Sequence, residues 1–155
     1  MEKIASFQTD HRLIKPGMYI SRTDGDIVTY DIRFVRPNGG VYLAPPSIHT
    51  IEHLFATFAR NSPHKDNIVY VGPMGCRTGF YLLTRGLSHE EAISLVADSF
   101  AFIADFNEDE IPGATEIECG NYLEHDLAAA KHDVSEFLKI FGDYDGKRLN
   151  YLCNS

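Results

Sequence analysis

The chain has few cysteines, few basic residues and no long hydrophobic run, and each shortage excludes a class of protein. Its 155 residues include 14 Lys and Arg against 22 Asp and Glu, which gives a formal net charge of -8. Nucleic acids and anionic membrane surfaces select clustered Lys and Arg, so we expect neither as a partner. No run approaches the roughly 18 apolar residues of a membrane span, and the N-terminal stretch lacks the apolar core of a secretory signal. The three cysteines therefore indicate thiols or metal ligands in a reducing cytoplasm, and not a disulfide framework.

Length and composition predict a single globular domain over residues 1–155. Hydrophobic residues make up 44% of the chain and charged residues 23%, which is ordinary for a folded protein and excludes disorder. The sequence has no repeat, no low-complexity tract and no long Gly/Ser linker at which it would divide into two units.

The spacing of hydrophobic residues predicts an α+β fold. Alternating or short apolar runs indicate strands within residues 25–37, 67–72, 79–84 and 114–122. Apolar residues at helical spacing indicate helices over about 47–61, 88–106 and 126–143. Ser47 is a plausible N-cap for the first helix, and Ser88 with Glu91 has the spacing of a capping box. Strands that lie before and between helices, without a regular β-α-β order, favour an antiparallel sheet with helices packed on one face.

The segment "IHTIEH", residues 48–53, has the residue types of a metal site. His49 and His53 are four positions apart on the predicted helix, so both imidazoles can face one ion. Glu52 lies about 60° around the helix from His49 and can sit beside the ion without binding it. A metal ion with open positions and a neighbouring carboxylate would combine a Lewis acid with a proton-transfer group. The simpler alternative is two hydrogen-bonded histidines and a solvated glutamate.

A durable site needs a third ligand, for which the cysteines are the first candidates. Cys153 is close to the C-terminus, where chains fray. Cys119 lies toward the end of the strand-like run 114–122, a rigid place from which to point a thiolate. Cys76 lies in the Gly-flanked loop "PMGCRTG", where Arg77 and the loop amides would favour its thiolate form. Composition leaves open which cysteine binds metal and which takes part in chemistry.

Five segments make the chain similar to a known family. They are "SFQTDH", "DIRF", "IHTIEHL", "PMGCRTGFYL" and "ECGNYLEHDL", and they occur in the order and approximate spacing of the S-ribosylhomocysteine lyase (LuxS) family. The resemblance covers nearly the whole chain. It implies a cytoplasmic homodimer of α+β fold with active sites at the subunit interface. The implied reaction cleaves S-ribosylhomocysteine to homocysteine and 4,5-dihydroxy-2,3-pentanedione, the precursor of the quorum-sensing signal autoinducer-2.

The resemblance also implies a role for each residue that matches a family motif. One divalent metal ion per subunit, ferrous iron with zinc or cobalt as substitutes, would be bound by His49, His53 and Cys119. Cys76 and Glu52 match the two proton-transfer residues. The positions that line the substrate pocket are Ser6, His11 and Arg33. The chain departs from the family pattern at Arg77, where glutamine is expected.

Two other functions are compatible with the same histidine pair. In a reversed-zincin metallopeptidase, Glu52 would activate a metal-bound water. A non-catalytic metal-binding module would have a closed site with four protein ligands and would unfold without its ion. The sequence offers a third ligand but no clear fourth, which favours an open, catalytic site.

Overall fold

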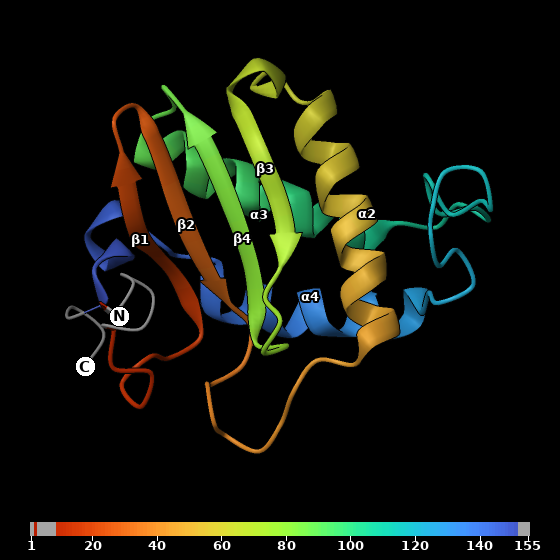
Figure 1. The fold of residues 1–155 in the computed structure, drawn as a ribbon, viewed down its shortest axis with the longest axis horizontal. Helices are drawn as coiled ribbons and strands as arrows, with labels where there is room; N and C mark the ends of the chain where they lie inside the picture. Colours follow the sequence, from red (N-terminus) through yellow and green to blue (C-terminus); the bar gives the residue numbers. More distant parts are fainter. Residues whose placement is uncertain (1, 3–8, 152–155) are drawn as a thin grey trace.

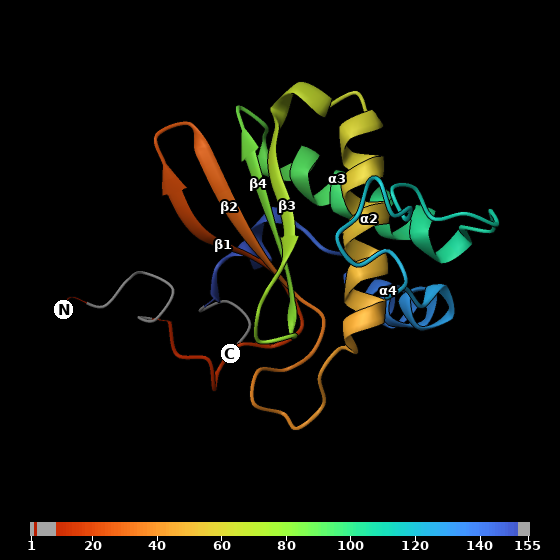
Figure 2. The ribbon, with the colours of Figure 1, turned by 45° about the vertical axis from the view of Figure 1, so that its right-hand side comes forward.

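The computed structural model describes residue 2 and residues 9–151, and their fold is the predicted α+β arrangement. The antiparallel sheet has the strand order β1-β2-β4-β3, formed by β1 (Gly17–Asp24), β2 (Ile27–Arg33), β3 (Ile68–Pro73) and β4 (Gly79–Arg85). The long helices are α2 (Pro45–Asn61), α3 (His89–Asp105) and α4 (Leu127–Phe141), and the short 3-10 helices are η1 (Lys65–Asn67) and η2 (Gly146–Leu149). All three long helices lie on one side of the sheet, with α2 beside β3 (Figures 1 and 2).

The hydrophobic core fills the space between the sheet and these helices. Phe80 and Leu82 alternate along β4 and are fully buried on its helix side, as the period of two predicts. Phe34, at the end of β2, packs against Phe100 of α3 and Phe137 of α4, with ring centroids 5.1 and 4.6 Å away. One aromatic cluster therefore joins the sheet to two helices. No helix in residues 9–151 is long and apolar enough to cross a membrane.

The opposite face of the sheet has no long helix over it in the described part of the chain. Asp31 of β2 pairs with Tyr81 of β4, and Thr29 pairs with Leu83, so these four side chains share that open face. Tyr70 of the edge strand β3 pairs with Leu83 and is 49% exposed. Half-buried apolar side chains thus lie on the open face beside a buried charge.

The helix starts agree with the sequence at two of three positions. The Ser88–Glu91 capping box of α3 is present, and Asp126 caps α4 through the Ala129 amide at 2.9 Å. The prediction that Ser47 caps α2 is wrong. Ala44 holds that position, and the two prolines that follow form the first turn, where a proline loses no needed N–H. The Ser47 hydroxyl instead donates to Asp133 of α4, which ties the two helices together.

Two strand predictions also need correction. Residues 114–122 form turns and not a strand. The amides of Glu118 and Cys119 both donate to the Thr115 carbonyl, at 3.1 and 2.9 Å, because this segment lies against α2 and away from any strand (Figure 2). Strand β1 was missed because its C-terminal half is polar and shows no alternation. It pairs with β2 through a tight turn in which Gly25 has a φ of 62°.

Candidate metal centre and active site

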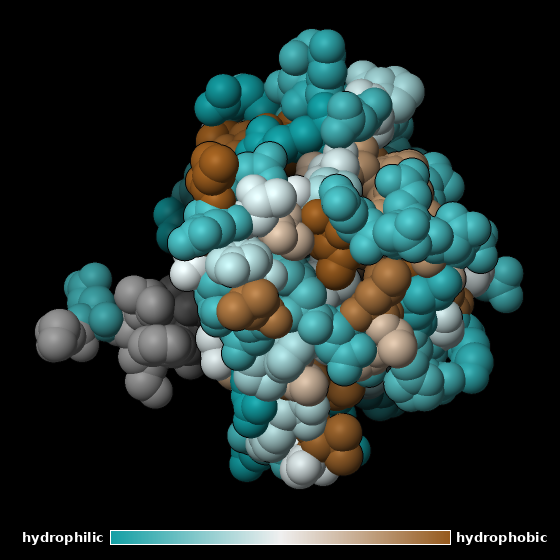
Figure 3. Space-filling model, turned by 90° about the vertical axis from the view of Figure 1, so that its right-hand side faces the viewer, coloured by the Kyte–Doolittle hydropathy of each residue, from teal (hydrophilic) through white to brown (hydrophobic). Residues whose placement is uncertain are grey.

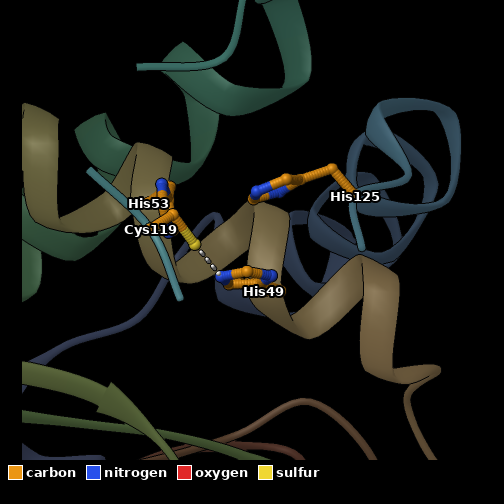
Figure 4. Close-up of side chains that lie close together, drawn as sticks. All are labelled: His49, His53, Cys119 and His125. Atoms are coloured by element: carbon orange, nitrogen blue, oxygen red, sulfur yellow. Dashed lines mark hydrogen bonds between the residues drawn. The ribbon is translucent and has the colours of Figure 1, made fainter. Parts of the chain in front are cut away.

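Four side chains that can bind metal converge between α2 and the segment that precedes α4 (Figure 4). They are His49 and His53 of α2 and Cys119 and His125 of the preceding segment, and their candidate ligand atoms all lie within 4.8 Å of one another. The Cys119 Sγ lies 3.3 Å from the Nε2 of His49. The rings of His49 and His53 are 4.6 Å apart and nearly perpendicular, so both can face a single point. The helical spacing of the two histidines therefore brings them together, as expected.

Backbone carbonyls orient both helical histidines. The Nδ1 of His49 lies 2.9 Å from the Glu124 carbonyl, and the Nδ1 of His53 lies 2.9 Å from the Pro112 carbonyl. A carbonyl oxygen only accepts, so each Nδ1 carries the hydrogen and each Nε2 keeps its lone pair. Metal-binding histidines are typically held in this way.

His125 is a member of the cluster that the sequence did not reveal. Its Nδ1 lies 3.2 Å from the Thr50 hydroxyl, which donates to the Pro46 carbonyl at 2.9 Å and accepts from the Asp126 amide at 3.0 Å. The single hydroxyl hydrogen is thus used, so the Nδ1 of His125 must be the donor. Its Nε2 is then an acceptor, and it is buried without a hydrogen bond among the described residues. His125 follows Cys119 in a loop, where no periodicity relates it to the helical pair.

His125 packs against His49 and does not bind the same ion. The two rings are stacked, with centroids 4.1 Å apart and planes 19° apart. Because an imidazole binds an ion close to its ring plane, rings stacked in this way cannot both direct Nε2 at one ion about 2.0–2.1 Å away. Burial first, and then the neighbouring His49 and His53, lowers the pKa of His125 to about 4, so the ring is neutral at pH 7. Its buried lone pair adds negative potential beside the cluster.

The donor set fits a divalent first-row metal ion. Two imidazoles whose Nε2 atoms carry a lone pair and one thiol are borderline-soft ligands, which suit iron(II), cobalt(II) or zinc(II) better than magnesium or calcium. The Cys119 sulfur accepts from the backbone amide of Asn121 at 3.4 Å, and a metal ion would bind this sulfur as a thiolate. The unpaired lone pair of His125 is the kind of buried acceptor that a nearby cation stabilises.

A second group of polar side chains surrounds Cys76 on the open face of the sheet. Arg33 is 3% exposed and forms a two-pronged ion pair with Asp31, with Nε–Oδ1 and Nη2–Oδ2 distances of 2.6 and 2.9 Å. Its Nη1 donates to the Thr78 hydroxyl at 2.6 Å and lies 3.6 Å from the Cys76 sulfur. This buried ion pair is fully hydrogen-bonded, as buried charges need to be.

The cation beside Cys76 is Arg33, although the sequence pointed to Arg77. Arg77 has a φ of 59°, and its guanidinium carbon lies 5.6 Å from the centre of the Tyr42 ring, so its charge is directed elsewhere. Arg33 reaches Cys76 from the neighbouring strand β2. That contact depends on strand pairing, which a sequence does not display.

Glu52 lies between two hollows in the surface. The first, of about 400 Å³, is lined by His49 and Glu52 on one side and by Gly75 and Arg77 of the Cys76 loop on the other. The second, of about 320 Å³, is lined by Glu52 and His53 among others. The Glu52 side chain is half-buried and makes no hydrogen bond among the described residues, so its carboxylate is free to exchange a proton.

The proposed substrate-binding residues are only partly placed. His11 lines a hollow of about 10 Å³ together with Asp31, Arg33 and Tyr151, and its Nδ1 lies 2.9 Å from the Thr9 carbonyl. A space of this size holds about one water molecule. Ser6 lies outside the described residues. His11 and Arg33 thus line one hollow, and Arg33 also contacts Cys76.

Comparison with known proteins identifies the family. The family model for S-ribosylhomocysteinase (LuxS) matches residues 4–144. The chain is 45% identical to the S-ribosylhomocysteine lyase of Clostridium acetobutylicum and 48% identical to that of Porphyromonas gingivalis, in both cases over 97% of this chain and 99% of the relative. It is 49% identical to the enzyme of Phocaeicola vulgatus over 89% of each chain. The chain belongs to the LuxS family.

Membership of the LuxS family decides between the three functions that the sequence left open. The relatives carry the name of a carbon-sulfur lyase over nearly their full length, so neither a reversed-zincin peptidase nor a non-catalytic metal-binding module is favoured. His125 lies in the same "ECGNYLEHDL" segment as Cys119.

Proposed function

We propose that this LuxS chain is an S-ribosylhomocysteine lyase. It would cleave S-ribosylhomocysteine to homocysteine, for the activated methyl cycle, and 4,5-dihydroxy-2,3-pentanedione, the autoinducer-2 precursor. The observation that carries the proposal is the His49, His53 and Cys119 cluster, with the free carboxylate of Glu52 beside it and the Cys76 loop across the same hollow. Relatives named for this activity at 45% identity and above support it.

His49, His53 and Cys119 would hold one divalent ion per chain, and iron(II) is the ion we propose, with zinc(II) or cobalt(II) as substitutes. When bound, such an ion supplies Lewis-acid stabilisation of negative charge on the sugar oxygens without changing its own oxidation state. The thiolate among the donors favours these ions over magnesium.

The position of the sulfur in the substrate explains why two proton-transfer residues are needed. The thioether is attached to C5, whereas the open-chain sugar has its carbonyl at C1. Two successive proton shifts move the carbonyl to C2 and then to C3. Removal of the C4 proton then forms the C4–C5 double bond as the C5–S bond breaks, and homocysteine leaves with the sulfur electron pair.

We assign the first proton shifts to Cys76, and the later shift and the elimination to Glu52. The Arg33 guanidinium lies 3.6 Å from the Cys76 sulfur, and Cys76 would act as the base in its thiolate form. The Glu52 carboxylate faces the same hollow as the loop of Cys76, which suits two groups that exchange protons with one substrate. His11, Arg33 and Ser6 are the proposed substrate-binding residues.

The direct test is to incubate anaerobically purified protein with S-ribosylhomocysteine and to measure free thiol. We expect one thiol per substrate consumed, together with the dicarbonyl product. A peptide library digested in parallel tests the metallopeptidase alternative. Peptide hydrolysis without thiol release would overturn the proposal.

We further propose one catalytic domain over residues 1–155 that functions in the cytoplasm, where the free thiols of Cys76 and Cys119 stay reduced. The proposed working unit is a homodimer. Its support is the open face of the sheet, where the exposed Tyr70 lies beside half-buried Leu83. Val41, in the loop between β2 and α2, is 69% exposed. Figure 3 shows the side of the molecule that lies at the right in Figure 1, where small hydrophobic patches are scattered between hydrophilic side chains.

The second support for the dimer is that the hollow beside His11 and Arg33 is too small for a substrate in one chain alone. Closure of the open face against a symmetry mate would supply a missing wall and exclude water. A two-fold axis would then build two identical sites from both chains.

A complementation experiment tests this shared site. His11→Ala and His53→Ala are each expected to be inactive alone. If the two residues come from different chains, each mixed dimer has one intact site, so an equal mixture recovers about one quarter of the wild-type activity. Exchange of protomers is verified by mass spectrometry with isotope-labelled protein. Complete exchange without any recovery would mean that His11 serves the site of its own chain.

A further inference from the structure

Hydrogen bonds link Arg33, Thr78 and the sulfur of Cys76. Arg33 has no acceptor atom, so its Nη1 must donate to the Thr78 hydroxyl, at 2.6 Å. The Thr78 hydroxyl hydrogen is then available for another partner. The Cys76 sulfur lies 3.1 Å from the Thr78 oxygen, closer than it lies to Arg33. When Cys76 is a thiolate, which has no hydrogen to donate, the hydroxyl hydrogen is directed at the sulfur.

Thr78 immediately precedes β4 and is held against the segment that follows β2. It is 1% exposed, and its carbonyl accepts from the amides of both Phe34 and Val35, at 2.9 and 3.2 Å. Gly79, the next residue, lets the strands approach closely, because a Cβ atom there would lie 1.9 Å from the Ile32 carbonyl oxygen. The Thr78 side chain is thus fixed beside Arg33 by its own backbone.

Arg33 is fixed from its other side by Asp31 and Tyr151. Tyr151 donates its hydroxyl hydrogen to the Asp31 Oδ2 at 2.8 Å, and its ring stacks on Tyr19 with centroids 4.7 Å apart. Asp31 therefore has no freedom to leave Arg33, and the guanidinium keeps one nitrogen for Thr78 and Cys76. Asp31 accepts from both Tyr151 and Arg33, and Arg33 donates to Thr78, so these side chains form one connected hydrogen-bond network beside the sulfur.

We infer that Thr78 is a positioning residue of the lyase, whose hydroxyl accepts from Arg33 and donates to the thiolate of Cys76. Thr78 thereby couples the buried positive charge to the sulfur. The other charged and titratable groups near the sulfur are Asp31, which neutralises part of the Arg33 charge, and Tyr81 on β4. The inference rests on the proposed function and deepens the role given there to Cys76.

The test is the rate at which iodoacetamide alkylates Cys76 in the metal-loaded protein, followed at that residue by peptide mass spectrometry. In Thr78→Val, which keeps the shape and removes the hydroxyl, we expect the rate at pH 7 to fall about tenfold. The pH profile of alkylation should also move to higher pH. Thr78→Ser, which restores the hydroxyl, should return the alkylation rate to within a factor of about three of the wild-type rate. Its pH profile should return toward that of the wild type. Thr84→Val is the matched control, because Thr84 is also fully buried and lies six positions further along.

The alkylation rates of the Thr78 variants decide whether its hydroxyl acts on Cys76. Wild-type alkylation kinetics in a folded Thr78→Val protein would overturn the inference, as would a Thr78→Ser protein that reacts as slowly as Thr78→Val. If Thr78→Val does not fold, Thr78→Ala takes its place, and a wild-type rate in that variant would overturn the inference in the same way. Wild-type protein that shows the expected alkylation pattern but releases no thiol from S-ribosylhomocysteine would instead overturn the proposed function.

Discussion

Replacement of Glu52 with glutamine is expected to lower homocysteine release by more than about 100-fold, the lower end of the usual contribution of a general acid-base residue. The glutamine amide keeps the size and position of the side chain but cannot take the C4 proton. Glu52 is not among the clustered ligand atoms, so the variant should still bind one metal ion per chain. Thiol release and metal content are measured on the same preparation.

Glu136→Gln provides the matched control for this experiment. It makes the same chemical change on the exposed face of α4, where Glu136 forms an ion pair with Lys139, and should retain wild-type turnover. A Glu52→Gln enzyme that works within a factor of about three of wild type would remove Glu52 from the mechanism. A variant that loses its metal would instead make Glu52 part of the metal centre.

Replacement of each cysteine with alanine should show that the two have different roles, one in metal binding and one in proton transfer. Cys119→Ala is expected to lose the metal ion, because two imidazoles remain where a durable site needs three ligands. Cys76→Ala should keep the full metal content and lose turnover by about 100-fold or more, since its sulfur contacts Arg33 and Thr78 and not the histidines. Metal content by atomic emission and thiol release give the two readouts.

The reverse pattern would contradict this assignment. A metal-free Cys76→Ala protein together with a metal-loaded Cys119→Ala protein would mean that the roles of the two cysteines are exchanged. Loss of metal from both variants would indicate that Cys76 supports the fold of the centre.

The helices were predictable from the sequence because their signals are local. The capping residues of α3 and the apolar period of α2 and α4 depend on neighbours within one or two turns. His49 and His53 share one face of α2 for the same local reason, because they are four positions apart on the helix. Strand β1 and the turns over residues 114–122 depend instead on whether a partner strand is present, and there the sequence misled.

The contacts that complete the candidate site come from distant parts of the chain. His125 meets His49 through the packing of the segment before α4 on α2. Arg33 meets Cys76 because β2 pairs with β4, and Tyr151 returns from the C-terminal end to hold Asp31. Motifs placed several of these residues in one site, but their hydrogen-bond partners follow only from the fold.

The most direct test of the central claim is thiol release during removal and return of the metal. Protein stripped with a chelator under anaerobic conditions is titrated with iron(II) and assayed with S-ribosylhomocysteine after each addition. If His49, His53 and Cys119 hold the ion that the lyase uses, activity will be absent at the start and will rise in proportion to bound iron until one ion is bound per chain. Full thiol release by the metal-free protein, or no release at any metal content, would contradict the account.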